Sequence, residues 1–541
     1  MQKTAPVSIF LMIGALILGM AIFAREIGLD PSPGWGKGRI ALLIFGLAIA
    51  LIPWIIRRQS AAPDKSTHTD LFMFPALLIV IGIYFWFTSV SHDLTSRYYS
   101  LLATSFRNGE LSLPLKPDPA LLELPNPYDP AARQGVRVPQ DLSLYKGKFY
   151  LYWGPAPALL LAIAGPFLPD KIDEVYFLFV SICGIFLSQF LLIMHLWQRF
   201  FQAIPKGIVI LSVVFAGLAN PALWLLCQPK LYETAIAGAQ FFFISGLASA
   251  IFALDRKPVS NWGLILAGTL WALAVGTRLV MVFPVVFMTL MVIYWIFKTN
   301  RPSLPKIVSR LIPLGLPLFM GAVSLSWYNW ARFGSILETG FTYQLAGPYL
   351  QKHLDELFLP GYIFQNLYNY LFNPFTIKPS FPFLYPARGI TREILPWQTL
   401  PPLYIAQAIT GFLCAVPFTV FASIPVVRSV KQFFRKNQAK DSSEESGVIS
   451  LPWITTSLIG SFAFPFLSLL AFFWAAMRYA EDFMPALLLL SIIGFWQGYQ
   501  ILGTTSGKGK IYVTLGVLLA MLSIVTGTFL ALSIYSTNGL L

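Results

Sequence analysis

Apolar stretches of about 20 residues recur along this chain of 541 residues, and they limit its fold more than any other feature. A helix needs about 20 mostly apolar residues to cross the hydrocarbon core of a bilayer. Hydrophobic residues make up 56% of the sequence and charged residues only 11%, a composition that does not suit a soluble domain. The sequence therefore predicts an all-α polytopic membrane protein.

We identify thirteen runs as candidate transmembrane helices: 7–24, 39–56, 71–90, 175–198, 207–226, 234–254, 260–276, 279–297, 307–330, 401–427, 451–476, 483–502 and 511–534. The apolar stretch 151–168 is left out because Pro155, Pro157 and Pro166 would break so short a helix, so we expect an interfacial or re-entrant piece there. The first run is interpreted as an uncleaved anchor rather than a signal peptide, because it is long and no A-x-A site follows it.

Basic residues give an independent test of the topology. With the N-terminus in the cytoplasm, the inner segments hold 19 of the 38 Lys and Arg residues, whereas the short outer loops hold 6. The net charge of +14 is therefore interpreted as topology and contact with anionic lipid, not as nucleic-acid binding.

This topology divides the chain into four parts. We expect two helices in 1–70, a core in 71–330 that includes an external loop at 91–174, a second external loop at 331–400, and four helices in 401–541. No P-loop, GxGxxG or HExxH motif is present, and the three cysteines and four histidines have no disulfide or zinc spacing. Any enzymatic site is therefore expected on the outer face.

The first external loop begins with "SHDLTSRYYSLLATSFRNGEL", directly after an apolar run. From Leu94 onward the apolar residues recur at spacings of three and four, which predicts an amphipathic helix lying along the membrane surface with Arg97 and Arg107 exposed. Asp93 stands at the seam between the two helices. From the residues alone, the interpretation of Asp93 or Ser91 as the cap of the surface helix is favoured.

The loop resembles the first external loop of the GT-C glycosyltransferases. The likeness lies in an aspartate that closes a span, an amphipathic helix with tyrosines, "NGEL", and a proline-bearing stretch that ends in "GKFYLYWGPAPALLL". It is nearest to the aminoarabinose and protein O-mannosyl transferases of this superfamily. The resemblance implies a polyprenyl-phosphate sugar as donor and Asp93 as a catalytic residue.

Three later segments are also similar to members of that superfamily: "WALAVGTRLVMVFP", "SWYNWARFGSILETG" and "RYAEDFMPALLLL". In the first of them, Arg278 matches a basic position of the family, which implies that it binds the donor phosphate. Two positions depart from the family pattern, since an acidic pair is replaced by His92 and Asp93, and the lysine before paired prolines by "YWGPAP". Lys146 and Lys148 lie nearby in sequence and are further candidates for phosphate binding.

Sugar transfer from a polyprenyl phosphate requires only one catalytic carboxylate. A sugar on a polyprenyl phosphate already carries a good leaving group, so transfer requires a base for the acceptor hydroxyl and cations for the departing phosphate. The second carboxyl group that a glycosidase uses as acid is not required. Asp93 suits the base, and direct displacement would invert the anomeric centre.

Further polar residues of the outer loops are candidates for acceptor or sugar binding: His92, Tyr98, Glu338, Tyr368, Asn369, Arg478 and Asp482. Each has a structural alternative, such as a tyrosine in the interfacial belt, a helix cap or a salt bridge. The external acids are also compatible with a divalent cation, and no other cofactor is expected.

The sequence therefore predicts a glycosyltransferase of the inner or plasma membrane that moves a sugar to an envelope acceptor on the extracytoplasmic face. A transporter or flippase of lipid-linked glycans is the alternative from another class, and it would require charges at mid-membrane, whereas almost all charges here lie at the ends of the apolar runs. An O-antigen polymerase or ligase is a third possibility, but it lacks the first-loop pattern.

The topology predicts that residues in 428–450 and in 91–174 lie on opposite sides of the membrane. Single cysteines introduced at Ser443 and Thr95 should react with a membrane-impermeant maleimide from opposite faces of sealed vesicles. Labelling of both from the same face would contradict the thirteen-helix arrangement.

Overall fold

A computed structural model divides the chain into two compact units, Met1–Ser89 and Val90–Leu541. It describes Leu18, Ala21, Ile22, Arg39, Leu43 and Gly46, and then residues 73–91, 95–139, 141–165, 174–219, 221–298, 304–435, 449–503 and 506–540. The runs predicted at 7–24 and 39–56 fall largely outside these residues. In the first unit, the described residues include most of α3 (Phe74–Ser91).

Ten of the thirteen predicted runs form helices. Within the described residues, nine helical segments are long and apolar enough to cross a membrane, which identifies a multi-pass membrane protein. They are α3, α7 (Glu174–Phe200), α8 with α9 (Lys206–Leu218, Ala222–Cys227), α10 (Leu231–Leu254), η4 with α12 (Leu279–Met281, Val282–Lys298), α13 (Leu304–Phe333), α17 (Leu451–Leu470), α18 (Met484–Leu502) and α19 (Gly507–Thr537). The tenth, α11 (Asn261–Thr277), is apolar but has only 17 residues.

The continuous helix predicted at 401–427 is wrong. The chain instead forms short extended pieces, β5 (Ile405–Ala406) and β6 (Ala408–Ile409), and becomes helical only in α15 (Phe412–Ala415), η8 (Pro417–Ala422) and α16 (Ser423–Arg435). Prolines explain the difference. They stand at the start of the segment and again at Pro417, and the residue before Pro417, Val416, is not helical. The predicted number of thirteen spans is therefore not confirmed.

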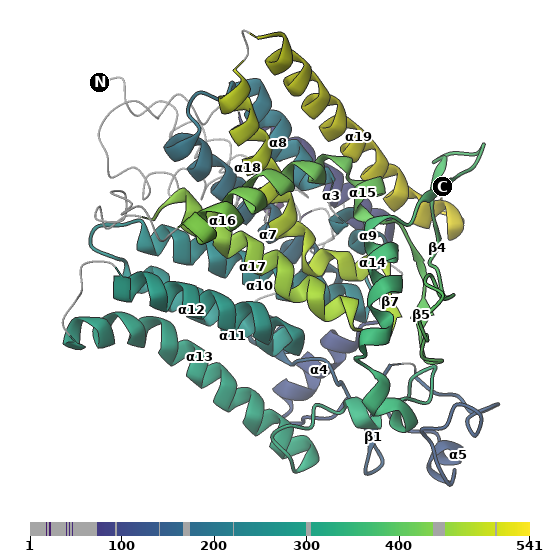
Figure 1. The fold of residues 1–541 in the computed structure, drawn as a ribbon. Coiled ribbons are helices and arrows are strands. Elements are labelled where there is room, and N and C mark those ends of the chain that lie inside the picture. Colours follow the sequence, from purple (N-terminus) through teal and green to yellow (C-terminus); the bar gives the residue numbers. More distant parts are fainter. Residues whose placement is uncertain are drawn as a thin grey trace. The chain divides into compact units, whose positions relative to one another are not determined.

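Helix α10 occupies the centre of the second unit and α13 its edge. Helix α10 packs against α7 and α11, and α11 packs in turn against α13 (Figure 1). In the 18-residue apolar stretch of each helix, 83% is buried inside the protein in α10 but only 11% in α13. Many of the exposed side chains of α13 are large and apolar, as expected for a surface that faces lipid.

Small residues allow α11 and α13 to approach closely. A Cβ atom at Gly268 would lie 2.4 Å from the Leu314 carbonyl oxygen, and one at Gly321 would lie 2.6 Å from the Cβ of Ala272. Without a hydrophobic driving force between helices in lipid, such close backbone packing is a main source of association. The interface thus fixes α11, whose end carries Arg278.

The two long stretches predicted to be external pack on each other. The first holds α4 (Tyr98–Arg107), α5 (Pro119–Leu122), the β1–β2 hairpin (Ser143–Tyr145, Lys148–Tyr150) and α6 (Ala156–Ala164). The second holds η5 (Phe341–Tyr343), η6 (Leu350–Glu356), η7 (Pro360–Tyr362), α14 (Ile363–Leu371) and the strands β3 (Phe375–Ile377) and β4 (Leu384–Arg388), which form a sheet with β6. The Ser143 hydroxyl donates to the Gly340 carbonyl at 2.7 Å.

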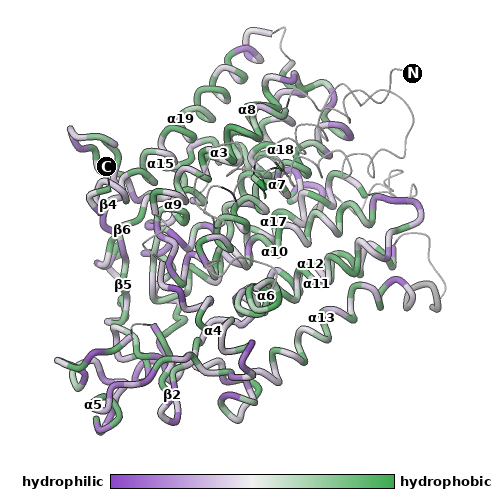
Figure 2. The backbone as a smooth tube through the Cα atoms, turned by 180° about the vertical axis from the view of Figure 1, so that it is seen from behind, coloured by the Kyte–Doolittle hydropathy of each residue, from purple (hydrophilic) through white to green (hydrophobic). Residues whose placement is uncertain are grey.

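Figure 2 shows hydrophilic residues gathered around α5 and β2, away from the apolar helices. At the opposite ends of the helices, Arg199 forms an ion pair with Asp255 and donates to the Ile449 carbonyl. Segments predicted to lie on the same side of the membrane therefore contact each other, both among the outer segments and among the inner ones. The nine-residue α6 also agrees with the expectation that 151–168 does not span the membrane.

Helix α4 is the amphipathic surface helix that the sequence predicts, with Tyr99 and Leu102 among its buried residues and Arg107 exposed. Ser91 does not cap it, because Ser91 ends α3 and donates to the Leu226 carbonyl. The carboxylate at the first turn comes instead from the fully buried Glu174, which accepts from the Tyr99 amide at 2.7 Å and from the Ser96 hydroxyl at 2.5 Å.

Replacement of Glu174 should therefore loosen the first loop. We expect Glu174→Ala to lower the free energy of unfolding by about 1 to 3 kcal/mol, the usual cost of leaving buried donors unpaired, and Glu174→Gln to cost less because one acceptor remains. Thermal melting of the detergent-purified protein measures this, with exposed Glu110→Ala as the control. A Glu174→Ala protein that melts with the parent would contradict the capping role.

Candidate functional site

Arg278 lies where the first external loop meets the end of α11. It is the C-cap residue of that helix and only 8% exposed. The loop approaches through Gly154, whose amide donates to the Thr277 carbonyl at 3.2 Å. A Cβ atom at Gly154 would lie 2.1 Å from the Gly276 carbonyl oxygen, so only glycine fits here. The "YWG" segment of the loop therefore lies directly beside the "GTR" segment at the end of α11.

The Arg278 guanidinium is held by one carboxylate and two aromatic rings. Its Nη1 forms an ion pair with Asp482, which is 2% exposed and ends η10 (Met477–Asp482). The guanidinium carbon lies 5.5 Å from the centre of the Trp153 ring and 5.4 Å from that of Tyr479, within range of a cation–π attraction. Burial raises the pKa of Asp482, and the Arg278 charge acts in the opposite direction.

A second arginine, Arg478, shares the ring of Tyr479 with Arg278. Its guanidinium carbon lies 5.1 Å from the centre of that ring and 4.7 Å from that of Tyr232. Its Nη1 donates to the side-chain oxygen of Gln407 at 2.9 Å. Two guanidinium groups thus flank one tyrosine, although they are 200 residues apart in sequence.

Two buried donors in this cluster have no hydrogen-bond partner among the described residues, namely Nε of Arg478 and Nε1 of Trp153. Buried N–H groups are nearly always paired in folded proteins, so unpaired ones call for an explanation. We name the set Arg278, Arg478, Tyr479, Trp153 and Tyr232 the arginine cluster. Its unpaired donors and two cations suit an anion with several oxygen atoms.

Carboxylates border the arginine cluster. Glu233, in the first turn of α10, is 2% exposed and is attracted to Arg478. Asp141 contacts Tyr232, accepts from the Gln344 side chain at 3.2 Å, and has a left-handed φ of 62°. The Tyr152 hydroxyl donates to that of Tyr232 at 3.0 Å. The site therefore has a cationic and an acidic side.

Of the predicted site residues, Arg278, Arg478 and Asp482 come together here. Tyr98 lies near the acidic side. Burial is the main reason why its pKa is raised, and the charges of Asp141 and Glu174 raise it further. His92 and Asp93 lie outside the described residues. The chain on either side of them is anchored, at Ser91 to Leu226 and at Ser96 to Glu174.

The other predicted residues have separate surroundings. Lys146 and Lys148 are exposed on the β1–β2 hairpin, where Lys148 lies 4.0 Å from Glu110, so the structure places Arg478 rather than a lysine next to Arg278. Glu338 accepts from the Gly340 amide at 2.6 Å and the Thr342 hydroxyl at 2.8 Å, which favours a turn cap.

Asn369 and Tyr368 belong to α14. Asn369 is fully buried and donates to the Ile390 carbonyl at 3.1 Å and the Tyr404 hydroxyl at 3.0 Å, which favours a structural role over sugar binding. Tyr368 is partly buried on the same helix. Among the described residues, no group of three or more His, Cys, Asp or Glu is arranged to hold a metal ion, and a divalent cation stays a prediction from sequence.

Sequence reasoning missed five members of the site: Trp153, Asp141, Tyr232, Glu233 and Tyr479. Trp153 and Tyr479 lie inside quoted motifs, but aromatic residues are so frequent here that they carried no signal by themselves. Glu233 offered a clearer signal, as an acid at the outer end of an apolar run.

No protein-family model and no curated protein matches the sequence. Among solved structures, the chain is similar to the crystal structure of the Archaeoglobus fulgidus oligosaccharyltransferase in its apo form, with a TM-score of 0.44 and 12% sequence identity. The similarity covers 87% of this chain and 57% of that one, so this chain spans little more than half the length of that protein. The function proposed below accordingly rests on the side chains of the site.

Proposed function

We propose that the protein is a membrane glycosyltransferase of the GT-C type, which transfers a sugar from a polyprenyl-phosphate donor to an envelope acceptor on the extracytoplasmic face of the inner or plasma membrane. The observation that carries the proposal is the arginine cluster, with its two guanidinium groups and two unpaired N–H donors. These groups suit the oxygens of a lipid-linked phosphate, and a planar guanidinium binds phosphate through two parallel hydrogen bonds.

The chemistry requires a departing phosphate and a deprotonated acceptor. In the proposed reaction, the acceptor oxygen attacks the anomeric carbon while its proton passes to a carboxylate, and the bond between that carbon and the phosphate oxygen breaks. Polyprenyl phosphate leaves with the bonding electron pair, and the anomeric centre inverts. Arg278 and Arg478 stabilise the negative charge that develops on the phosphate. Asp93 is the proposed base, at the sequence position adjoining this loop.

The distribution of buried charge favours this proposal over a transporter. A pathway through the membrane requires ionisable groups near mid-membrane. Among the described residues, Glu174 and Glu233 lie in the first turns of their helices, Arg332 lies in a last turn, and Arg278 is a cap. These four buried charges thus lie at helix ends, next to the two external stretches.

Loss of the Arg278 guanidinium should weaken donor binding. We expect Arg278→Ala to bind a polyprenyl phosphate about 10- to 100-fold more weakly, and Arg278→Lys to stay impaired because a point charge lacks the planar fork. Titration of the purified protein with polyprenyl phosphate measures this. Because Arg278→Ala leaves Asp482 unpaired, the double variant with Asp482→Ala and a melting curve separate misfolding from lost binding.

Lys148→Ala is the matched control, since it removes an exposed cation from the same face. It should leave donor binding unchanged. If instead Lys148→Ala weakens binding and Arg278→Ala does not, then Arg278 only anchors the loop and the phosphate site lies on the hairpin.

Asp93→Asn should lower turnover by about 10² to 10⁴, the usual contribution of a general base, while donor binding stays near that of the parent. The assay incubates purified protein with radiolabelled polyprenyl-phosphate sugars and crude envelope glycans. The exposed Glu123→Gln serves as control. Normal turnover of well-folded Asp93→Asn would remove Asp93 from the mechanism.

A further inference from the structure

The β3–β4 hairpin carries large apolar side chains that the rest of the protein leaves uncovered. Ile377 is 73% exposed, Phe381 50% and Phe383 42%. All three lie at or beside the end of the hairpin where the chain turns, since Ile377 belongs to the last pair of the strand ladder. Neighbouring large apolar groups on a protein surface often mark contact with a partner or with a membrane. The helix against which the hairpin packs indicates which of these covers it.

Helix α19 packs against β4, and Figure 1 shows β4 beside the end of that helix. The exposed apolar side chains of α19 recur at spacings of three and four, which forms one stripe along the helix: Ile511, Leu515, Leu518, Leu522 and Val525. The next position of this series is Phe529. The rings of Phe381 and Phe383 pack on it, with their centres 6.1 Å and 6.3 Å from that of Phe529. The exposed rings of the hairpin thus adjoin the stripe with which α19 faces lipid.

Helix geometry gives the depth of this contact. Lys510 is the last charged residue of α19, and the next 20 or so residues cross a hydrocarbon core, which places its far boundary at about Leu530. Phe529 therefore lies at the border between hydrocarbon and headgroups. The Tyr385 hydroxyl lies 2.9 Å from that of Ser536, which is about 10 Å farther along the helix. The hairpin therefore runs from the headgroup region back towards the hydrocarbon, with its turn foremost.

The turn of the hairpin is suited to surroundings with little water. Pro379 and Pro382 have no amide N–H that would need a partner. The Lys378 amide donates to the Phe383 carbonyl at 2.8 Å, and the Phe383 amide donates to the Ser380 carbonyl at 2.9 Å. Because unpaired backbone groups are costly close to hydrocarbon, these features lower the cost of placing the turn there.

The charge of the hairpin matches lipid phosphates. Residues 375–388 include two basic side chains, Lys378 and Arg388, both exposed, and no acidic one. The Lys378 ammonium lies 4.0 Å from the centre of the Tyr385 ring, which is the residue at headgroup depth. A long basic side chain of this kind keeps its stem among apolar groups and its charge among the headgroups.

We propose that the β3–β4 hairpin is inserted into the lipid leaflet at the C-terminal end of α19, with Phe381 and Phe383 at the level where the acyl chains begin. The occupant of its exposed face is phospholipid, whose acyl chains cover the rings and whose phosphates attract Lys378. A soluble protein partner would need this face in water, and the depth of Phe529 argues against that. The inference goes beyond the proposed sugar transfer and does not depend on it.

A fluorophore on a single cysteine measures the depth of the hairpin. The three cysteines of the chain are replaced by alanine, Phe381→Cys is labelled with bimane, and the full-length protein is reconstituted in phospholipid nanodiscs. Phosphatidylcholine with a nitroxide near the head of the acyl chain should quench this label more than one with a nitroxide near the chain end, and aqueous iodide should quench it little. A melting curve checks the fold of each labelled protein.

Two matched positions calibrate the measurement. The label on Lys148→Cys, an exposed position of the polar β1–β2 hairpin, should be quenched by iodide and not by lipid. The label on Leu522→Cys, within the α19 stripe, should respond most to a nitroxide near the chain end. If the label at position 381 instead behaves like that at position 148, the hairpin stands in water and the proposal is overturned. Protection from both quenchers also overturns it, because protein would then cover the rings.

A charge on the hairpin provides an independent test in the same labelled protein. A carboxylate is costly to hold next to hydrocarbon, so Phe383→Asp should lift the turn, with loss of lipid quenching and gain of iodide quenching at position 381. Phe383→Leu, which stays apolar, should keep the parent pattern. Unchanged quenching in Phe383→Asp contradicts insertion. Each of these readouts is independent of sugar transfer, so failure of this proposal is distinguishable from failure of the proposed function.

Discussion

The ion pair between Arg278 and Asp482 joins the parts of the site, because it links the end of α11 to η10 beneath the first external loop. Removing both charges from water is costly, and the attraction between them often only offsets that cost. Replacing one partner alone typically costs about 3 to 5 kcal/mol, whereas an apolar pair of similar volume is often no less stable. Stability is therefore a weak reason for this pair. A requirement for a cation fixed at this place explains it better.

Irregular backbone close to the membrane must also satisfy its hydrogen-bonding groups, and α14 does much of this for the second external stretch. Asn366, Asn369 and Asn373 recur at spacings of three and four and are all buried. The Asn366 amide donates to the carbonyls of Leu469 and Leu470 at the end of α17, and the Asn373 amide donates to Ile409 at 2.7 Å. These hydrogen bonds fix the extended segment that contains Gln407 and Thr410. The sequence shows the spacing, but not that the amides are consumed by backbone carbonyls.

The difference between what the sequence predicts and what it misses follows from the range of the interactions. Apolar length depends on neighbouring residues only, so ten of thirteen helices were predictable, and 401–427 failed where prolines interrupt an otherwise apolar run. Arg278, Arg478 and Asp482 were each predictable as polar residues at span ends. Their meeting around Tyr479 was not, since it depends on contacts across 200 residues. The same holds for Glu174, which caps a helix 75 residues earlier in the chain.

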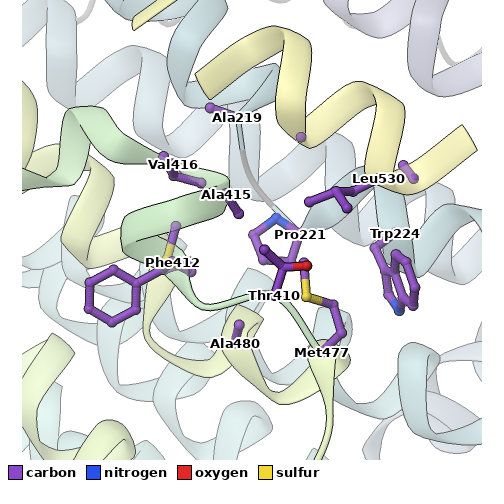
Figure 3. A pocket seen from close by; sticks show the side chains of 13 residues that line it. Ala219, Pro221, Trp224, Thr410, Phe412, Ala415, Val416, Met477, Ala480 and Leu530 are labelled. Atoms are coloured by element: carbon purple, nitrogen blue, oxygen red, sulfur yellow. The ribbon is translucent and has the colours of Figure 1, made fainter. Parts of the chain in front are cut away.

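The 3₁₀ geometry of η10 explains how so short an element contacts both the arginine cluster and a small apolar pocket. With three residues per turn, side chains at i and i+3 lie above one another on the same side. Met477 and Ala480 form one side and line the apolar pocket that Figure 3 shows between η10, α15 and α19. Tyr479 and Asp482 form another, where both contact Arg278. In an α-helix, at 3.6 residues per turn, the two members of each pair would instead be about 60° apart around the helix axis.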